Sequence, residues 1–384
     1  MWRTATGIKG VIFMGSGDLA TPRSTVRVAL PMLTLVPGGM GGSETYAKAL
    51  TRELASQPDL DVVSVVAQGA RGFSQGVREE VAMHVVGGGS TAQRVSTVLT
   101  GSLPVGKPRQ IVAGADVVHY PFSVPLPRSP RGTPYVQTLF DVQHRDLPDL
   151  FSVQERVYRR FMYDRPARLA AAVITISEFA RQRAIEQLGL DPAKVYVAHL
   201  GVDTSDHAFV TGPRDDFILY PARPWPHKNH ERLLTAFELL RRKRPTVRLV
   251  LTGGGLEDLG ALPEWVERRG LVPQKELAAL YQRASCLVFP SLYEGFGLPP
   301  LEAMASGCPV ASANSCSLPE ICGDAAIMFD PTDPQAIADG IQRAIEGKNV
   351  LVERGLARVQ RFSWRACGDI HAQIYQDVAG RRIR

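Results

Sequence analysis

The chain has little cysteine for its length. Its 384 residues include five cysteines, an odd number with no C-x-x-C pair, which argues against a disulfide framework and against a structural zinc site. Small buried side chains in a reducing compartment are the role expected for them. Long apolar runs are also missing, since no stretch approaches the ~20 residues of a membrane helix. These absences predict a cytoplasmic protein.

Several other signals are missing as well. The segment Met1 to Ser24 holds only one short apolar run, too short for a secretory signal, and is expected to be a flexible N-terminal extension. No recognised DNA-binding motif and no aromatic-interleaved basic sheet accompanies the arginines, which argues against nucleic acid as a partner. No D-x-D pair of carboxylates is convincingly placed for magnesium, so no metal site is predicted.

The length and the pattern that is present favour two domains. A single core rarely exceeds roughly 250 residues, and 45% hydrophobic with 21% charged residues is typical of a globular protein. Strand-like runs alternate with helical ones, which predicts parallel sheets with crossover helices. The expected strands cover 27–36, 61–67, 117–119, 135–139, 172–176, 195–198, 217–220, 247–252, 287–290 and 310–313. The expected helices cover 43–56, 229–242, 276–283, 299–306 and 364–375.

Two carboxylates flank the start of one predicted helix. The apolar run 286–289 indicates a buried strand, and Pro299-Pro300 predicts a helix that opens there. Glu294 is therefore expected on the strand-to-helix loop and Glu302 in the first helical turn. On these residues alone, an alternative stays open in which Glu302 only favours the helix dipole and Glu294 is solvated.

The residues between the two acids suit an anion. Gly295, Phe296, Gly297 and Leu298 can turn their backbone amides toward one point, where the helix N-terminus adds positive potential. A carboxylate accepts hydrogen bonds from neighbouring hydroxyls, so acids on both sides of a phosphate cradle fit a ligand with diols at both ends of a diphosphate. That description fits a nucleotide sugar.

The segment Glu294-Gly-Phe-Gly-Leu-Pro-Pro-Leu-Glu302 resembles the E-x7-E motif of the retaining glycosyltransferases of family 4, which have the GT-B fold. Further landmarks of that family's nucleotide-binding domain resemble segments 220–229, 251–255, 270–277 and 317–320. The resemblance implies an α/β fold of two Rossmann-like domains facing across a cleft. It implies an extension over 1–24, an N-terminal acceptor domain over 25–204, a C-terminal donor domain over 205–363, and a last helix over 364–384 that crosses back.

The same resemblance assigns the donor site. Gly41 and Gly42, which open the first helix, resemble the family's donor-phosphate loop, and Gly253 falls in a second glycine landmark. Arg223 and Lys228 are expected to neutralise the charge on the departing diphosphate. Glu294 would hold hydroxyls of the transferred sugar, and Glu302 would hold the ribose.

The acceptor side departs from the family pattern. His119 ends a strand where the family often places a histidine near the reacting sugar, but Pro121 follows where a second histidine is common. Phe140 likewise replaces a histidine before Asp141. His119 is therefore expected to hold a sugar hydroxyl, with a strand-end structural role as the alternative, and Asp141 and His144 are expected on the acceptor side.

The implied reaction moves a sugar from a nucleoside-diphosphate sugar to an acceptor hydroxyl with retention of configuration. Cations and amides at the diphosphate would make a metal or other cofactor unnecessary. Overall likeness favours mannosyltransferase-type members and GDP-mannose, with UDP-linked sugars open. The acceptor would be a saccharide, a lipid-linked molecule or a small molecule. A GT-B epimerase of nucleotide sugars and a catalytically idle, nucleotide-sugar-binding subunit remain alternatives.

An arginine-rich segment follows the predicted acceptor landmark. Arg156, Arg159 and Arg160 share one helical face, and Val153, Val157 and Phe161 share another. A basic amphipathic helix can lie on an anionic membrane or meet an acidic acceptor, and it can also be a solvated surface helix. Peripheral contact with the inner face of the membrane is therefore an open expectation.

Overall fold

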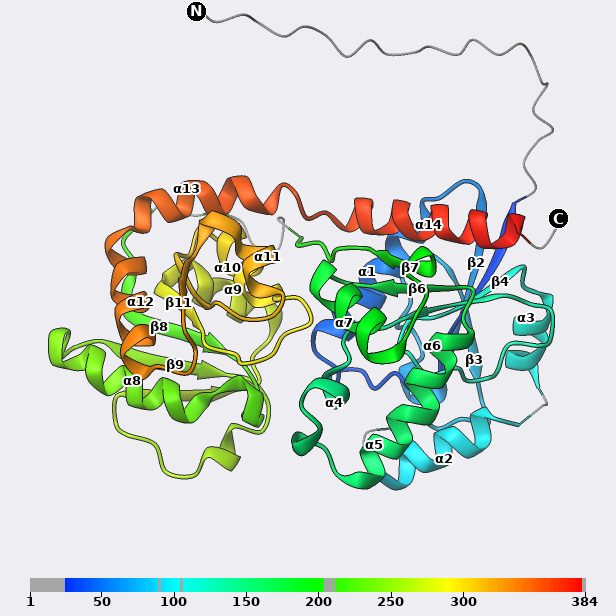
Figure 1. The fold of residues 1–384 in the computed structure, drawn as a ribbon, viewed down its shortest axis with the longest axis horizontal. Helices are drawn as coiled ribbons and strands as arrows, with labels where there is room; N and C mark the ends of the chain where they lie inside the picture. The colour runs from blue at the N-terminus through cyan, green and yellow to red at the C-terminus, as the bar shows by residue number, and fades with distance from the viewer. Residues whose placement is uncertain (1–24, 89–90, 104–105, 204–208, 210–211, 382–384) are drawn as a thin grey trace, which may run out of the picture.

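The computed structural model describes residues 25–88, 91–103, 106–203, 209 and 212–381. These residues form two α/β domains that lie side by side, each on its own parallel sheet (Figure 1). The expected extension over 1–24 lies outside the described residues, as does the expected domain boundary at 204 and 205.

The N-terminal domain holds a seven-stranded sheet in the order β3-β2-β1-β4-β5-β6-β7. Its strands are β1 (Val26–Met32), β2 (Leu60–Ala67), β3 (Arg78–Ala82), β4 (Val117–Tyr120), β5 (Tyr135–Thr138), β6 (Ala172–Thr175) and β7 (Val195–Val197). Its helices are α1 (Gly42–Ala55), α2 (Thr91–Gly101), α3 (Lys107–Gly114), α4 (Gln143–Asp146), α5 (Val153–Arg159), α6 (Arg165–Leu169) and α7 (Glu178–Leu188).

The C-terminal domain holds a six-stranded sheet in the order β10-β9-β8-β11-β12-β13. Its strands are β8 (Asp215–Pro221), β9 (Arg248–Thr252), β10 (Val266–Gly270), β11 (Ala284–Phe289), β12 (Val310–Ala313) and β13 (Ile327–Phe329). The helices that follow are α8 (His230–Lys243), α9 (Gln274–Arg283), α10 (Leu298–Ala305), α11 (Leu318–Cys322), α12 (Pro334–Glu346), α13 (Lys348–Val359) and α14 (Trp364–Gly380).

Alternate residues of the central strands enter different cores, because successive side chains of a strand point to opposite faces of the sheet. Leu30 of β1 packs in the cluster that contains α1 and α14, whereas Ala29 packs in the cluster that contains α3. In the second sheet, Tyr220 joins the cluster with α8 and α12, and Leu219 joins the one with α9 and α10. Helices therefore cover both faces of each sheet.

The strand order places the expected ligand site. In each sheet the order reverses once, between β1 and β4 in the first and between β8 and β11 in the second. Ligands of open parallel sheets bind outside the carboxyl ends of the strands at such a switch point. The loops that carry Gly42, Arg223 and Glu294 follow β1, β8 and β11 respectively, so all three leave a sheet at its switch point.

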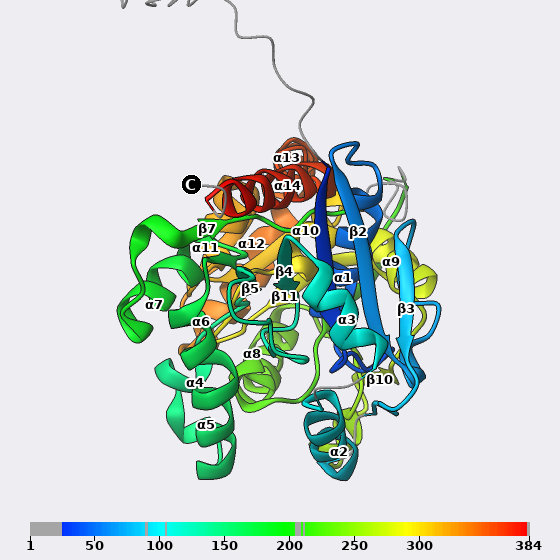
Figure 2. The ribbon, with the colours of Figure 1, turned by 90° about the vertical axis from the view of Figure 1, so that its right-hand side faces the viewer.

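The last helix belongs spatially to the first domain. The chain passes from α13 on the C-terminal domain into α14, which packs against α1, β1 and β4 (Figures 1 and 2). The crossing point is tight, because a Cβ on Gly201 would lie 2.2 Å from the backbone nitrogen of Trp364. The N-terminal and C-terminal domains are therefore joined by two chain crossings.

Candidate active site

A cleft of about 800 Å³ lies between the two domains, at the switch points of both sheets. Residues of the β11–α10 loop line one side, and residues of the β1–α1 loop and of α4 and α5 line the other. From the predicted donor site, Gly42, Lys228, Glu294 and the segment 295–298 line this cleft. The structure therefore brings together residues that lie more than 200 positions apart in the sequence.

The β11–α10 loop has the backbone arrangement of an anion cradle. Ser317 donates its hydroxyl hydrogen bond to the carbonyls of Glu294 and Phe296, at 2.9 and 2.7 Å, and Ser177 donates to the carbonyl of Gly295 at 2.7 Å. Within the described part of the chain, the N–H groups of 295–298 have no acceptor. Donors left without a partner beside a helix N-terminus are the usual features of a phosphate site.

Two glycines let this loop approach its neighbours. A Cβ on Gly295 would lie 2.5 Å from the carbonyl oxygen of Phe140 in the other domain. Gly297 has a φ of +121°, and a Cβ there would lie 2.8 Å from Leu318. Side chains at either position would push the loop away from the N-terminal domain or from α11, so both positions require glycine.

Lys228 and Glu294 form an ion pair inside the cleft. The Lys228 ammonium lies 2.6 Å from a Glu294 carboxylate oxygen, and their side chains are only 15% and 13% exposed. Lys228 ends a short turn after β8, and its carbonyl accepts a hydrogen bond from the Tyr220 hydroxyl at 2.6 Å. The turn is further held by Asn229, whose amide donates to the carbonyl of Pro290 at 3.0 Å. Both charges are thus fixed at the mouth of the amide cradle.

Arg223 lies where the two domains meet. Its guanidinium donates to the carbonyl of Gly39, in the other domain, at 3.4 Å. Gly253 packs against the backbone of this segment: with a φ of +135°, a Cβ there would lie 2.7 Å from the Ala222 carbonyl. Gly253 therefore packs against the backbone beside Arg223 and is not part of the cleft lining, so its direct contact with the donor stays a prediction.

The glycines of the β1–α1 loop have different positions. Gly42 lines the cleft, and a Cβ on it would lie 3.3 Å from Leu298, so the two glycine-rich loops face each other. Gly41 has a φ of +58° and is the N-terminal cap of α1. The carboxylate of Glu44 accepts the N–H of Gly38 at 2.9 Å, which fixes the entry to this loop.

Glu302 is one residue further into helix α10 than expected, which puts it just past the first turn. Helix α10 begins at Leu298, and Gly297 is its N-terminal cap residue. The prolines that follow fit the first turn, because the N–H groups that they lack would have no partner there. Glu302 therefore lies in the second turn. Its carboxylate accepts a hydrogen bond from the buried Tyr281 hydroxyl at 2.9 Å, and burial beside this acid raises the pKa of Tyr281.

The structure contradicts the expectation that His119 holds a sugar hydroxyl. The residue is fully buried, its Nε2 lies 2.8 Å from the Thr138 hydroxyl, and its Nδ1 lies 2.6 Å from the Tyr375 hydroxyl. Both ring nitrogens are thus occupied by protein partners. Burial lowers the pKa of His119, and neighbouring His371 lowers it further. Its role is that of a neutral core residue beneath α14.

The two expected acceptor-side residues separate. Asp141 lines the cleft, and its carboxylate accepts the N–H of Gln143 at 3.0 Å. His144 is buried and lies 2.8 Å from Asp164. Burial alone would raise the pKa of Asp164, but hydrogen bonds from His144 and Arg145 outweigh it and lower the pKa. His144, a residue of α4, therefore ties this helix to Asp164 and does not line the cleft.

Several cleft residues are missing from the sequence prediction. His227 and Tyr293 line the cleft. They are the sequence neighbours of Lys228 and Glu294, and this adjacency could have predicted their position. Burial, with a contribution from the Lys228 charge, lowers the pKa of His227 to about 4. Arg159 lines the cleft with its guanidinium carbon 4.5 Å from the centre of the Phe151 ring, and no motif marks it out from the other arginines.

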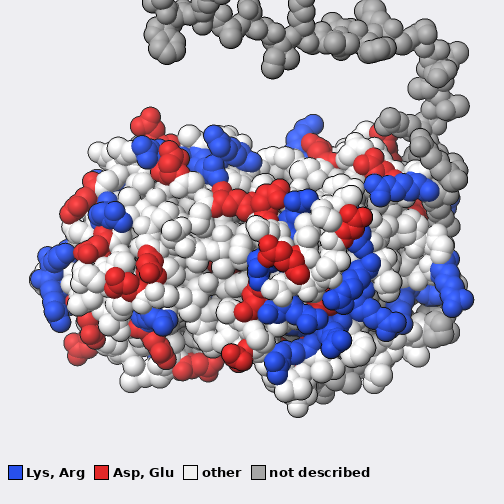
Figure 3. Space-filling view, in the orientation of Figure 1, with Lys and Arg blue, Asp and Glu red and all other residues white. Residues whose placement is uncertain are grey.

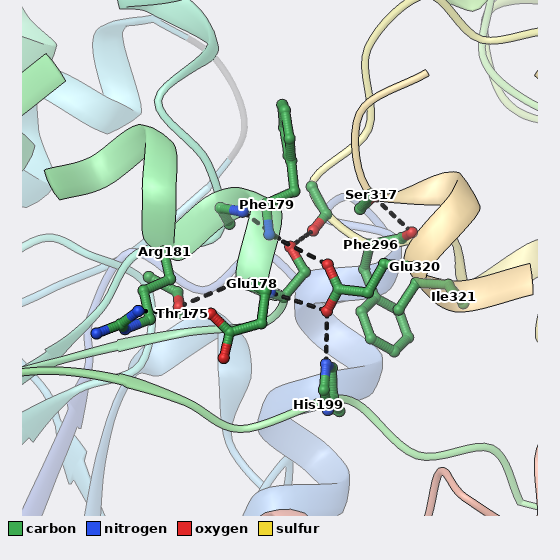
Figure 4. A network of polar contacts seen from close by, with 12 residues as sticks. Thr175, Glu178, Phe179, Arg181, His199, Phe296, Ser317, Glu320 and Ile321 are labelled. Atoms are coloured by element: carbon green, nitrogen blue, oxygen red, sulfur yellow. Dashed lines mark hydrogen bonds and ion pairs between the residues drawn. The ribbon is translucent and has the colours of Figure 1, made fainter. Parts of the chain in front are cut away.

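A second set of polar contacts joins the domains beside the cleft (Figure 4). The carboxylate of Glu320 accepts the N–H groups of Glu178 and Phe179, at 2.8 and 3.1 Å, and lies 2.7 Å from Nε2 of His199. Burial would raise the pKa of Glu320, yet these hydrogen bonds lower it. Glu320 thus caps the first turn of α7 from the opposite domain.

The described residues hold no candidate metal cluster and no candidate membrane span. No group of three or more His, Cys, Asp or Glu side chains gathers there in a way that could hold a metal ion. Within the same residues, no helix has the length and apolar character needed to cross a membrane.

The chain matches two domain families in succession. Residues 40–206 match Glycosyltransferase Family 4, and residues 203–355 match Glycosyl transferases group 1. Among characterised relatives, the O-antigen chain mannosyltransferase B of Escherichia coli is 34% identical over 227 residues, 52% of this chain and 58% of that protein. The MMP alpha-(1->4)-mannosyltransferase of Mycolicibacterium hassiacum is 28% identical over 237 residues, 57% of each chain. The chain thus spans little more than half the length of these relatives.

Solved structures share the fold. The sucrose-phosphate synthase of Thermosynechococcus elongatus has a TM-score of 0.73 at 20% identity, covering 92% of this chain and 99% of that one. HepE of Anabaena, solved with UDP and glucose, has a TM-score of 0.67 at 18% identity, with coverage of 92% and 100%. The structure has the GT-B fold that the sequence predicts, and its two halves match glycosyltransferase domain families. The chain is therefore similar to proteins that combine a Glycosyltransferase Family 4 domain with a group 1 domain, and in particular to mannosyltransferases.

Proposed function

We propose that the protein transfers a sugar from a nucleoside-diphosphate sugar to an acceptor hydroxyl with retention of anomeric configuration and without a metal. The Lys228–Glu294 pair beside the amides of 295–298 carries this proposal. It sets a cation, a carboxylate and free N–H donors within one cleft. A diphosphate fits the cation and the amides, and sugar hydroxyls fit the carboxylate.

The reaction breaks the bond between the anomeric carbon and the diphosphate oxygen, and the acceptor oxygen bonds to the same carbon on the same face. The acceptor proton passes to the departing diphosphate, so no side chain need act as a nucleophile. Negative charge grows on the diphosphate as the bond breaks. Lys228, Arg223 and the 295–298 amides would stabilise that charge because they are held in place before reaction.

The cationic side of the site supports transfer without a divalent ion. The Lys228 ammonium and the free amides offer the positive potential that magnesium supplies in other phosphate-transferring sites. Turnover is expected to persist in EDTA and to gain little from added magnesium or manganese. A complete loss of turnover in EDTA that magnesium restores would contradict this part of the proposal.

A mannosyl donor is the first candidate, because the relatives named above are mannosyltransferases. GDP-mannose and UDP-glucose are to be tested side by side, since HepE was solved with UDP and glucose. Stabilisation against heat ranks the donors without knowledge of the acceptor: a ligand at 100 times its Kd raises the free energy of unfolding by about 2.7 kcal/mol.

The activity test incubates the protein with a panel of nucleotide sugars and simple mannosides or glucosides, and measures free nucleoside diphosphate. NMR of the product reports the configuration at the anomeric carbon. Release of nucleoside diphosphate with a retained glycoside product is the expected result. An inverted product would contradict the mechanism, and an altered sugar still attached to its nucleotide would favour an epimerase. Binding without turnover would favour an idle nucleotide-sugar-binding subunit.

A further inference from the structure

Helix α5 presents different residues to two hollows. Glu155 and Arg159, one turn apart, line the cleft. On the other side of the helix, toward α4, lies a shallower groove of about 320 Å³. Its lining includes Val153, Arg156, Val157 and Arg160. The cleft-facing residues are accounted for by the candidate active site, whereas this outer face is not.

The outer side of this segment exposes apolar side chains. Val153, Val157 and Phe161 are 62%, 49% and 57% exposed and follow one another at intervals of four residues. Such spacing places side chains along one side of a helix. The last of them stands on the π-helical turn Arg160–Asp164, which continues α5. Exposed apolar groups gathered in one stripe mark a surface that contacts another molecule or a membrane.

Arginines surround this stripe. Arg156, Arg160 and Arg165 are exposed, and none of the three has an ion pair with another described residue. Figure 3 shows basic side chains gathered over α4, α5 and α6. The segment has two acids. Asp164 is buried and bonded to His144 and Arg145, and Glu155 lines the cleft on the other side of the helix. The surface therefore carries uncompensated positive charge.

The combination of charge and apolar groups decides the kind of partner. A soluble polyanion would need the arginines alone and would leave the apolar stripe in water. At the surface of an anionic bilayer, arginines meet lipid phosphates while neighbouring apolar side chains enter the headgroup region. We propose that α5 and the turn after it, residues 153–165, dock the protein on an anionic bilayer.

Docking through α5 would bring the cleft to the membrane, because the same helix lines both. Membrane binding itself does not depend on sugar transfer. It can therefore be tested, and can fail, independently of the proposed reaction.

Co-sedimentation of the full chain with lipid vesicles is the test. Vesicles of phosphatidylcholine alone are compared with vesicles of equal parts phosphatidylcholine and phosphatidylglycerol. Wild-type protein is expected to sediment with the anionic vesicles, less so as salt increases, and to stay in solution with the neutral ones. The charge reversal Arg156→Glu with Arg160→Glu is expected to weaken partitioning about tenfold or more, and Val157→Asp is expected to weaken it as well.

Matched controls lie on the other domain. Arg242→Glu changes an exposed arginine of α8, and Val350→Asp changes a valine of α13 that is 52% exposed. Both are expected to bind vesicles as the wild type does. Equal thermal unfolding midpoints for all variants exclude misfolding as the cause of a difference.

Three outcomes would overturn the proposal. One is the absence of wild-type binding to anionic vesicles. A second is equal binding by the α5 variants and the controls. In the third, the wild type does not bind vesicles but binds heparin or self-associates, and the α5 variants lose that binding. The surface would then contact a soluble polyanion or a second copy of the chain.

Discussion

Lys228 and Glu294 neutralise each other in the free protein, at 2.6 Å and with little exposure. In the proposed function, a donor that enters the cleft replaces this contact. The ammonium then binds a diphosphate oxygen, and the carboxylate binds sugar hydroxyls. Breaking a mostly buried pair by removing one partner leaves an unpaired charge behind. In the proposed reaction, the pair would therefore supply both halves of donor recognition.

The two acids of the motif are expected to differ in effect. Glu294→Gln should lower kcat about 100-fold, because a neutral amide holds sugar hydroxyls and the Lys228 charge more weakly as the transition state forms. Glu302→Gln should mainly raise the donor KM, by about tenfold, because the ribose is bound equally before and during reaction. Steady-state release of nucleoside diphosphate at varied donor concentration measures both effects.

Tyr281→Phe serves as the control for Glu302, since it removes the hydrogen bond to that carboxylate and keeps the acid. Equal kcat values for wild type and Glu294→Gln would show that Glu294 does not hold the reacting sugar.

For single residues, the sequence predicts that Glu294 and Lys228 lie in one site, and both line the cleft. It does not predict that they form an ion pair, because residue type and spacing do not show which side chains are in contact. The prediction for His119 is wrong for a related reason. The partner of its Nδ1 is Tyr375, 256 residues further along the chain, and no local pattern reveals that contact. Arg159 was expected to share one helical face with Arg156 and Arg160, but it lines the cleft whereas those two line the outer groove.

Helix α14 is held to the N-terminal domain by buried polar groups. The Tyr46 hydroxyl lies 2.8 Å from Nε2 of His371 and 2.8 Å from the Thr138 hydroxyl. The Thr138 hydroxyl is also hydrogen-bonded to Nε2 of His119, and Nδ1 of His119 is hydrogen-bonded to the Tyr375 hydroxyl. Buried networks of this kind are stable when every member has a partner and costly when one member gains a charge.

The buried histidines predict a loss of stability in mild acid. Burial lowers the pKa of His371 from 6.5 to about 4, so the unfolded chain binds a proton at this site before the folded one does. The free energy of unfolding should therefore fall as pH decreases from about 6.5 to 4, by roughly 3 kcal/mol from this residue. Urea unfolding monitored by circular dichroism at several pH values measures it.

His371→Gln is expected to reduce the slope of the free energy of unfolding against pH by the equivalent of up to one proton. A smaller slope should remain, because burial also lowers the pKa of His119. A wild-type free energy of unfolding that is constant between pH 6.5 and 4 would contradict this account of the α14 network.

Among the elements, the central strands and their helices were predictable because their apolar runs are long. Three edge strands were not predicted: β13, β3 and β10. Strand β13 is apolar but has only three residues, Ile327–Phe329. Strands β3 and β10 were missed for another reason. Their sequences, Arg-Glu-Glu-Val-Ala and Val-Glu-Arg-Arg-Gly, are rich in charge, because a strand paired on one side only can face solvent. Charge at such positions removes the hydrophobic pattern on which a strand prediction depends.

For the whole molecule, the relation between the domains decides whether the site is complete. The donor loops of 228 and 294 belong to one domain, and the Gly42 loop belongs to the other. Glu320 holds the domains together by capping α7 and contacting His199 (Figure 4). Glu320 belongs to the C-terminal domain and α7 to the N-terminal domain. Their contact therefore requires the two domains to lie as close together as they do in this structure.

Removing that contact is expected to open the molecule. Glu320→Ala should increase the radius of gyration in small-angle X-ray scattering and lower the transfer rate about tenfold, since an open cleft separates the loops of 228 and 294 from the Gly42 loop. Glu178→Ala is the matched control, because its exposed side chain pairs with Arg181 within its own helix. An unchanged radius and rate in Glu320→Ala would mean that other contacts determine closure.

The central claim is that Lys228 binds the diphosphate of the donor, and calorimetric titration tests it most directly. GDP and UDP are titrated into the wild type, into Lys228→Met and into Lys243→Met, whose lysine forms a surface pair with Asp339 at 3.2 Å. At least one nucleotide should bind the wild type and Lys243→Met alike, and bind Lys228→Met about tenfold or more weakly. Equal affinity for Lys228→Met and the wild type, or no binding of either nucleotide, would contradict the account.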